Sequence, residues 1–205
     1  MNYAAVDAGG NAVVKVEVPA EWANIVVKEE EHTADAARPD FVKKIVDPIN
    51  ALKGDLLPVS AFNGREDGTW DNGTAAYEKR GIAVNVPEWK IGNCIQCNQC
   101  AYVCPHAVIR PFLATEEEAA ASGVEWKQGL GETKEYKFRI QISPMDCTGC
   151  SNCVDVCPAK DKALVMRPLE EQMPQQKNWD YITKNIGYKQ VVDKTKSVKN
   201  LQFAQ

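Results

Sequence analysis

The chain has 205 residues, 44% of them hydrophobic and 25% charged, and its formal net charge at pH 7 is −4. These values lie near the averages of globular proteins, so they exclude a wholly disordered chain. The slight negative charge argues against a nucleic-acid partner, and no apolar stretch approaches the roughly 18 residues that would cross a membrane. The N-terminus shows no basic segment followed by an apolar one, so we expect a folded, cytoplasmic protein.

The N-terminal region, residues 1–27, is predicted to be strand material. Valines alternate with charged residues over positions 14–18, which is the period-two pattern of a strand. The preceding pair, Gly9-Gly10, is typical of a turn.

A helical pattern follows this region. Apolar residues recur at helical spacing from Phe41 to Leu52, and Asp40 is placed to be the N-cap. Because Pro48 interrupts the pattern and Gly54 ends it, we predict two short helices.

Turns and a strand are predicted before the first cysteine. Asp67-Gly68 and Asn72-Gly73 indicate turns in a loop. Residues 81–89 are then predicted to be a strand that leads into the cysteines.

Eight cysteines occupy 64 residues of the chain in two groups of one pattern, C-x2-C-x2-C-x3-C-P. The first group is Cys94, Cys97, Cys100, Cys104 and Pro105, and the second is Cys147, Cys150, Cys153, Cys157 and Pro158. This pattern is that of bacterial-type four-iron, four-sulfur clusters.

A long insertion separates the two groups, because 42 residues lie between Cys104 and Cys147. Within it, residues 116–121 are predicted to form a short exposed helix, with Thr115 as the N-cap and Gly123 at the end. The three glutamates that begin this helix suit the helix dipole, so they are read as a solvated helix start rather than a docking face.

Two further strands are predicted around the second cysteine group. Apolar and polar residues alternate over 136–142, which predicts a half-buried strand with Arg139 on its polar face. Residues 163–166 form a short apolar run before Pro168 and are expected to close a small antiparallel sheet. The five lysines between positions 184 and 199 are read as a solvated linker.

The pattern of each group assigns its cysteines to two clusters. Three cysteines at two-residue intervals suit three corners of one cluster, and in two-cluster ferredoxins the cysteine before the proline binds the other cluster. We therefore expect one cluster on Cys94, Cys97, Cys100 and Cys157, and the other on Cys147, Cys150, Cys153 and Cys104. Pro105 and Pro158 are expected in the first turn of a following helix or at its entry.

Structural zinc and disulfides are the alternatives. Eight thiolates are enough for two zinc ions, but a zinc site has no need of a third cysteine at the same interval or of a fourth before proline. Disulfides are disfavoured in the absence of a secretion signal.

The residues around the cysteines are expected to support an anionic cluster. Gly149, Asn98, Asn152 and Ser151 are residues whose backbone can turn N–H groups toward sulfur. Five apolar residues would limit solvent access or simply belong to the core: Ile95, Val103, Val108, Val154 and Leu164. The two histidines are His32 and His106, and we expect His106 to be a surface residue or a residue beside the cluster rather than a general base.

Several stretches besides the cysteines are shared with a known family: Leu57-Pro-Val-Ser-Ala-Phe62, Asp67-Gly-Thr69, Tyr77-Glu-Lys-Arg-Gly-Ile-Ala83, Val86-Pro-Glu-Trp89, Val103-Cys-Pro-His106 and Lys162-Ala-Leu-Val-Met166. Through them the chain resembles the pyruvate:ferredoxin (flavodoxin) oxidoreductases, large thiamin-diphosphate enzymes of anaerobic metabolism. The likeness is strongest over residues 57–168, and Ser151 stands where that family more often has glycine.

The resemblance implies an α+β, bacterial two-cluster ferredoxin-like fold, with a long insertion between the cluster loops and an N-terminal α/β remnant or linker. It divides the chain into the end of a preceding α/β domain (1–55), a lead-in (56–80), the two-cluster domain (81–168, insertion 112–134) and a connecting segment (169–205).

The resemblance also implies a function. The chain would relay single electrons through two [4Fe-4S] clusters from a thiamin site elsewhere to ferredoxin or flavodoxin. It has no catalytic residue of its own, and thiamin diphosphate, magnesium and a third cluster are expected only in the rest of the enzyme, because the chain lacks the G-D-G motif and uses all eight cysteines. The alternative is a separate ferredoxin-like electron-transfer subunit of another multi-subunit oxidoreductase.

Overall fold

The computed structural model describes residues 2–25 and 38–203. The chain divides into two compact units, Met1–Asp71 and Asn72–Gln205. Residues 26 and 27 of the predicted strand region, and His32, lie outside the described residues. Among the described helices, none is long and apolar enough to cross a bilayer.

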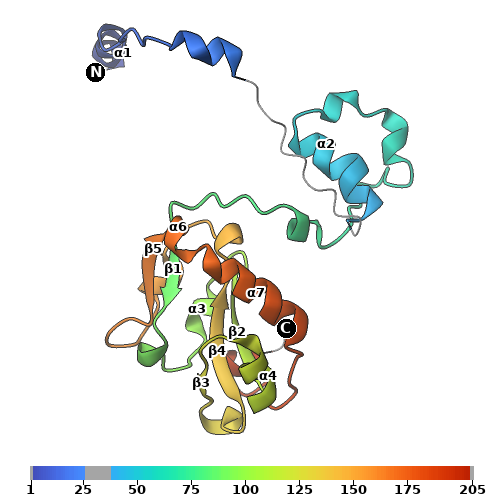
Figure 1. Ribbon diagram of the computed structural model, residues 1–205, viewed down its shortest axis with the longest axis vertical. Coiled ribbons are helices and arrows are strands. Elements are labelled where there is room, and N and C mark those ends of the chain that lie inside the picture. The colour runs from blue at the N-terminus through green and yellow to red at the C-terminus, as the bar shows by residue number, and fades with distance from the viewer. Residues whose placement is uncertain (1, 26–37, 204–205) are drawn as a thin grey trace. The chain divides into compact units, whose positions relative to one another are not determined.

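The N-terminal region is helical where strands were predicted. Asn2–Asn11 form helix α1, which contains Gly9 and Gly10, and the valines at 14–18 are exposed and outside any strand (Figure 1). A strand needs a hydrogen-bonded neighbour, and the described residues offer this segment none. The predictions of a strand and of a Gly-Gly turn are therefore wrong.

The rest of the first unit is built from short helical segments. A π-helical turn, Val42–Val46, continues into α2, Asp47–Asn50, and two 3₁₀ turns follow at Gly54–Leu56 and Val59–Phe62. The prediction of two short helices with a break at Pro48 is therefore wrong, because residues 40–50 form one continuous helical run. Pro48 lies in the first turn of α2 and does not interrupt the run. The run ends at Asn50, before Gly54. The predicted turns at Gly68 and Gly73 are confirmed, and both glycines have φ near +80°.

Two small antiparallel sheets organise the second unit. Strand β1, Asn85–Trp89, pairs with β5, Leu164–Pro168, and a second sheet has the order β2, Ile109–Ala114, then β4, Lys137–Ile142, then β3, Lys127–Gln128. The strands predicted at 136–142 and 163–166 are confirmed, and the one predicted at 81–89 begins only at Asn85. The run at 163–166 does not join the sheet of β4, since it pairs with β1.

Short helices surround these sheets. They are α3, Gln99–Tyr102; α4, Glu116–Ser122; α5, Asn152–Asp155; α6, Leu169–Gln172; α7, Pro174–Asn185; and α8, Val198–Leu201. Shorter 3₁₀ turns lie at Thr74–Tyr77, Ile91–Asn93, Gly131–Thr133 and Pro144–Asp146. The predicted helix of the insertion is confirmed as α4: Thr115 and Glu118 form a reciprocal capping box, and Gly123 ends the helix with φ +66°. It is not an exposed helix, because Ala119 is buried in a cluster with Ile182 and Ile186.

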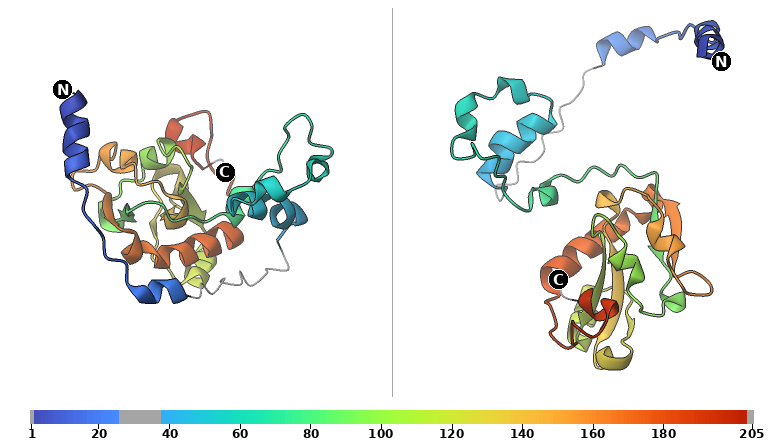
Figure 2. Two further views of the ribbon diagram at one scale, coloured as in Figure 1. Left: turned by 90° about the horizontal axis from the view of Figure 1, so that it is seen from above. Right: turned by 180° about the vertical axis from the view of Figure 1, so that it is seen from behind.

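Helix α7 packs against β4, and this changes the expected burial of that strand (Figures 1 and 2). Residues 138–142 are all buried, including the polar Arg139 and Gln141. The prediction of a half-buried strand is therefore wrong, because the polar face lies under α7 instead of in water.

The lysine-rich C-terminal segment is not a solvated linker, because it folds back onto the second unit. Phe203 is buried in the core that contains Phe138, and their ring centroids are 6.2 Å apart. Lys189 pairs with Glu118 at 2.8 Å, and Lys196 pairs with Glu132.

Candidate iron-sulfur sites

The two cysteine loops have the same local geometry. In each loop the residue two positions after the first cysteine has positive φ, +59° at Gln96 and +72° at Gly149, and its backbone N–H donates to the first cysteine Sγ at 3.4 Å. The residue after the second cysteine is again left-handed, with φ +60° at Asn98 and +65° at Ser151. The loops therefore aim backbone N–H groups at sulfur, as an anionic cluster requires.

A short helix follows each left-handed residue, and it carries the third cysteine. Helices α3 and α5 pack against each other, which brings the two loops side by side. Both helices end before Pro105 and Pro158, so the prediction that these prolines begin a helix is wrong. The chain turns at Pro105 and just after Pro158 instead.

Two cavities collect the eight cysteines in sets of four. One is lined by Cys94, Cys97, Cys100 and Cys157, together with Trp89, Ile95, Asn98, Ile140, Ala163 and Leu164. The other is lined by Cys104, Cys147, Cys150 and Cys153, together with residues that include Pro87, His106, Val108 and Met166. We call them the first and the second cysteine cavity. In each, the cysteine that precedes proline comes from the opposite loop.

A mononuclear metal site is the alternative to a cluster. A single zinc ion holds four thiolates at about 2.3 Å, which draws the sulfurs within about 4 Å of one another. Within residues 2–25 and 38–203, no three Cys, His, Asp or Glu side chains converge closely enough for one ion. The cysteines surround a space instead, as a multi-atom cluster needs.

Burial makes several of these thiols weak acids. It raises the pKa of Cys153 to about 12, with the neighbouring thiols Cys147, Cys104 and Cys150 adding to the effect. Burial also raises the pKa of Cys100 and of Cys147. Thiolates packed this densely need positive charge between them, and ferric and ferrous iron supply it.

The apolar residues predicted to cover the cysteines divide into two groups. Ile95 and Leu164 line the first cavity and Val108 lines the second, whereas Val103 and Val154 line neither. His106 is exposed at the edge of the second cavity.

Two buried side-chain atoms of the described residues lack a hydrogen-bond partner, Trp89 Nε1 and Asn98 Oδ1, and both residues line the first cavity. The indole N–H fits a cluster that accepts hydrogen bonds through its sulfurs.

The insertion and the C-terminal segment cover the first loop. The Gln96 side chain donates to Gln128 O at 2.7 Å and accepts from Leu130 N at 3.1 Å. Asn98 donates to Lys199 O at 3.1 Å, and Lys127 donates to Cys94 O at 2.6 Å. Sequence reasoning missed Gln96, because a buried glutamine with positive φ carries no signal in the pattern.

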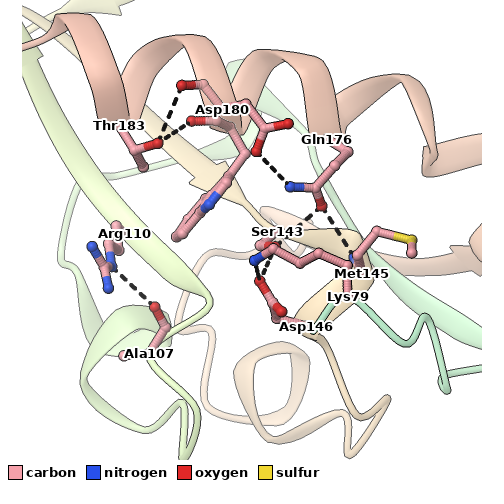
Figure 3. Close-up of polar contacts among 10 residues, drawn as sticks. Lys79, Ala107, Arg110, Ser143, Met145, Asp146, Gln176, Asp180 and Thr183 are labelled. Carbon is pink, nitrogen blue, oxygen red and sulfur yellow. Dashed lines mark hydrogen bonds and ion pairs between the residues drawn. The ribbon is translucent and has the colours of Figure 1, made fainter. Parts of the chain in front are cut away.

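A different polar network holds the second loop (Figure 3). Asp146, directly before Cys147, accepts from Ser143 Oγ at 2.6 Å and pairs with Lys79. Gln176 on α7 accepts from Ser143 Oγ at 3.2 Å and from Met145 N at 3.3 Å. A backbone hydrogen bond just after the lead-in adds to this attachment, because Gly81 N–H donates to Met145 O at 2.9 Å. Cys150 in this loop is exposed to solvent.

Comparisons with known proteins agree with this geometry. A family model described as a 4Fe-4S dicluster domain matches residues 93–160, and EKR, described as a domain of unknown function, matches residues 27–83. Glu78, Lys79 and Arg80 lie inside the second match.

Similar full-length proteins are oxidoreductases that act on pyruvate. The chain is 47% identical over its whole length to the pyruvate-flavodoxin oxidoreductase of Enterobacter agglomerans, covering 17% of that protein. It is 54% identical, over 83% of its length, to the pyruvate:ferredoxin oxidoreductase of Moorella thermoacetica, covering 14% of it. The chain therefore spans about a sixth of these relatives. It carries a 4Fe-4S dicluster domain in a ferredoxin-like segment and is homologous to one part of the pyruvate:ferredoxin and pyruvate-flavodoxin oxidoreductases.

Proposed function

We propose that this chain relays single electrons as a module of a pyruvate, or 2-oxoacid, oxidoreductase. The observation that carries the proposal is the pair of four-cysteine cavities beside each other, within a segment homologous to these enzymes. When bound, the two clusters supply the one-electron chemistry that protein side chains lack.

The ligands proposed for cluster 1 are Cys94, Cys97, Cys100 and Cys157. Those proposed for cluster 2 are Cys147, Cys150, Cys153 and Cys104. The lining of the two cavities supports this crossed assignment. It also gives each loop a share in both clusters, so the two loops are held in one fixed relation.

The polypeptide contributes the surroundings of the clusters. The N–H groups of Gln96 and Gly149 donate to cysteine sulfur, which stabilises negative charge on it. Ile140 and Leu164, both almost fully buried, keep water from the first cavity. Because the packing of α3 on α5 places the loops next to each other, an electron has a short route between the two sites.

Partners and the remaining cofactors follow from the homology. We propose that electrons arrive from a thiamin-diphosphate site with magnesium and a third cluster, located in the rest of the enzyme, and leave to ferredoxin or flavodoxin. The names of the relatives support these acceptors. None of the eight cysteines forms a disulfide, which supports a reducing, cytoplasmic location.

Analysis of the anaerobically purified chain tests the proposal. We expect about eight iron and about eight acid-labile sulfide per chain, with a broad visible absorption that bleaches on reduction. Stoichiometric zinc without labile sulfide would overturn the proposal. We also expect that the chain alone does not oxidise pyruvate; pyruvate-dependent reduction of ferredoxin by the 205-residue chain would contradict the location of the thiamin site elsewhere.

A further inference from the structure

Arg139 is a buried cation without a close carboxylate. Only 7% of its surface is exposed, and its guanidinium donates to Gln141 Oε1 at 2.8 Å, Glu125 O at 2.5 Å and Gln175 Oε1 at 3.3 Å. In the described ranges, no Asp or Glu side chain lies within 4 Å of it to form an ion pair.

The nearest acids compensate this charge only in part: the Glu125 carboxylate raises the pKa of Arg139, against the larger effect of burial. The Glu125 side chain is exposed to solvent, and Glu88, which lines the same cavity, pairs with Lys90 and Arg167. Burial lowers the pKa of Arg139 to about 10, which still leaves the guanidinium charged at neutral pH. A buried charge of this kind is costly unless something compensates it.

The surroundings of Arg139 point to the compensating group. Its guanidinium carbon lies 5.4 Å from the centroid of the Trp89 ring. Trp89 and Ile140 line both the polar cavity that contains Arg139 and the first cysteine cavity, so they form the wall between the two. Among the described residues, none lines both the Arg139 cavity and the second cysteine cavity.

We propose that Arg139 is the residue that sets the reduction potential of cluster 1 above the value it would have without this charge, acting through Trp89. This inference rests on the proposed function. Reduction adds an electron to an already anionic cluster, and a cation one side chain away stabilises the reduced form more than the oxidised form. The second cysteine cavity shares no described lining residue with the Arg139 cavity, so the charge of Arg139 should affect the reduction potential of cluster 2 less.

The size of the effect follows from Coulomb's law. A unit charge about 10 Å away at an effective dielectric constant of about 20 changes the ratio of reduced to oxidised cluster by about tenfold at a fixed potential. For a one-electron couple, tenfold corresponds to about 59 mV.

Two variants test the proposal by different routes. Arg139→Met removes the charge and keeps a long apolar side chain, and Gln175→Glu places a carboxylate beside the guanidinium. Glutamate suits that position because it lies in the first turn of α7. Lys184→Gln is the control: it changes the net charge by the same amount at an exposed position of the same helix.

Redox titration followed by electron paramagnetic resonance reports each cluster separately, after the signals are assigned with Cys97→Ala and Cys150→Ala. We expect Arg139→Met and Gln175→Glu each to lower the potential of cluster 1 relative to that of cluster 2, and Lys184→Gln to leave the difference unchanged. If Arg139→Met does not retain both clusters, Gln175→Glu decides the matter alone, since it keeps the arginine in place.

Unchanged potentials in the charge variants, with both clusters present, would overturn the inference and show that Arg139 only joins β4 to α7. Equal shifts of both clusters would also overturn it. Failure of the proposed function has a different signature, because the unmodified chain would then show no two-cluster signal to titrate.

Discussion

Lys79 and Asp146 form an ion pair across 67 residues of sequence, and Asp146 directly precedes Cys147. The lysine belongs to the Glu-Lys-Arg stretch of the lead-in, and the aspartate ends the 3₁₀ turn that begins the second loop. The pair therefore attaches the lead-in to a loop that holds cysteines of the second cavity (Figure 3).

Lys79→Met is expected to weaken the hold on cluster 2, because it leaves the Asp146 carboxylate uncompensated beside an anionic site. A partly buried pair of this kind contributes about 1 kcal/mol, so the rate of iron loss from cluster 2 to a chelator should rise by about fivefold. The double variant Lys79→Met with Asp146→Asn should recover most of the loss. Arg80→Met is the control, since Arg80 pairs with its near neighbour Glu78 and with no other acid among the described residues. Equal effects of the two single variants would mean that the pair does not act on the loop.

Ser151→Gly and Asn98→Gly are expected to act in opposite directions, although the two residues occupy equivalent positions with nearly equal φ. Glycine removes the cost of the left-handed conformation, so Ser151→Gly should stabilise the cluster-free chain by about 0.5–1 kcal/mol. Asn98→Gly also removes the hydrogen bond from the Asn98 side chain to Lys199 O and should destabilise the cluster-free chain by about 1 kcal/mol. Denaturant unfolding measures both changes in stability. Stabilisation by both substitutions would show that backbone strain alone governs these loops.

The crossed assignment predicts which cluster each proline-adjacent cysteine supports. Cys157→Ala should damage cluster 1 and spare cluster 2. The other proposed ligands of cluster 1 lie in the first loop, more than 50 residues before Cys157 in the chain. Cys104→Ala should do the reverse. Electron paramagnetic resonance spectra of the two variants show which cluster's signal is lost or converted to that of a three-iron form. If Cys157→Ala gives the same spectrum as Cys150→Ala, each loop ligates its own cluster and the assignment is wrong.

Glu118→Gln should reduce stability in a pH-dependent way. Burial alone would raise the pKa of Glu118, but the Lys189 ammonium and the Thr115 N–H outweigh it and lower the pKa below the usual 4.5. A lowered pKa contributes stability above the unfolded value, and this contribution disappears as the pH falls through the folded value. The variant should therefore cost about 1 kcal/mol at pH 7 and much less near pH 3.

Unfolding of the cluster-free chain at several pH values tests this dependence. Glu117→Gln is the matched control, because Glu117 is an exposed neighbour in the same helix turn. A cost that stays constant between pH 7 and pH 3 would mean that the charge of Glu118 does not hold the C-terminal segment.

Strand β4 shows which features could be predicted from the sequence and which could not. Its extended conformation was predictable, because apolar and polar residues alternate over 136–142. The burial of Arg139 and Gln141 was not, since it depends on α7, a helix that begins more than 30 residues later. The burial of Phe203 could not be predicted for the same reason, because no local pattern indicates that the lysine-rich segment packs against the core of the second unit.

The sequence by itself determined the chemistry of this protein. The cysteine spacing identifies the cluster type, the capping residues of α4 identify its ends, and the glycines at 68 and 73 identify turns, because each of these is a local relation of the chain. The tertiary structure decided how Gln96 is held, why Arg139 and Gln141 are buried, and what lies on either side of Trp89. Those relations join residues far apart in sequence, and they exist only once the sheets and α7 have packed.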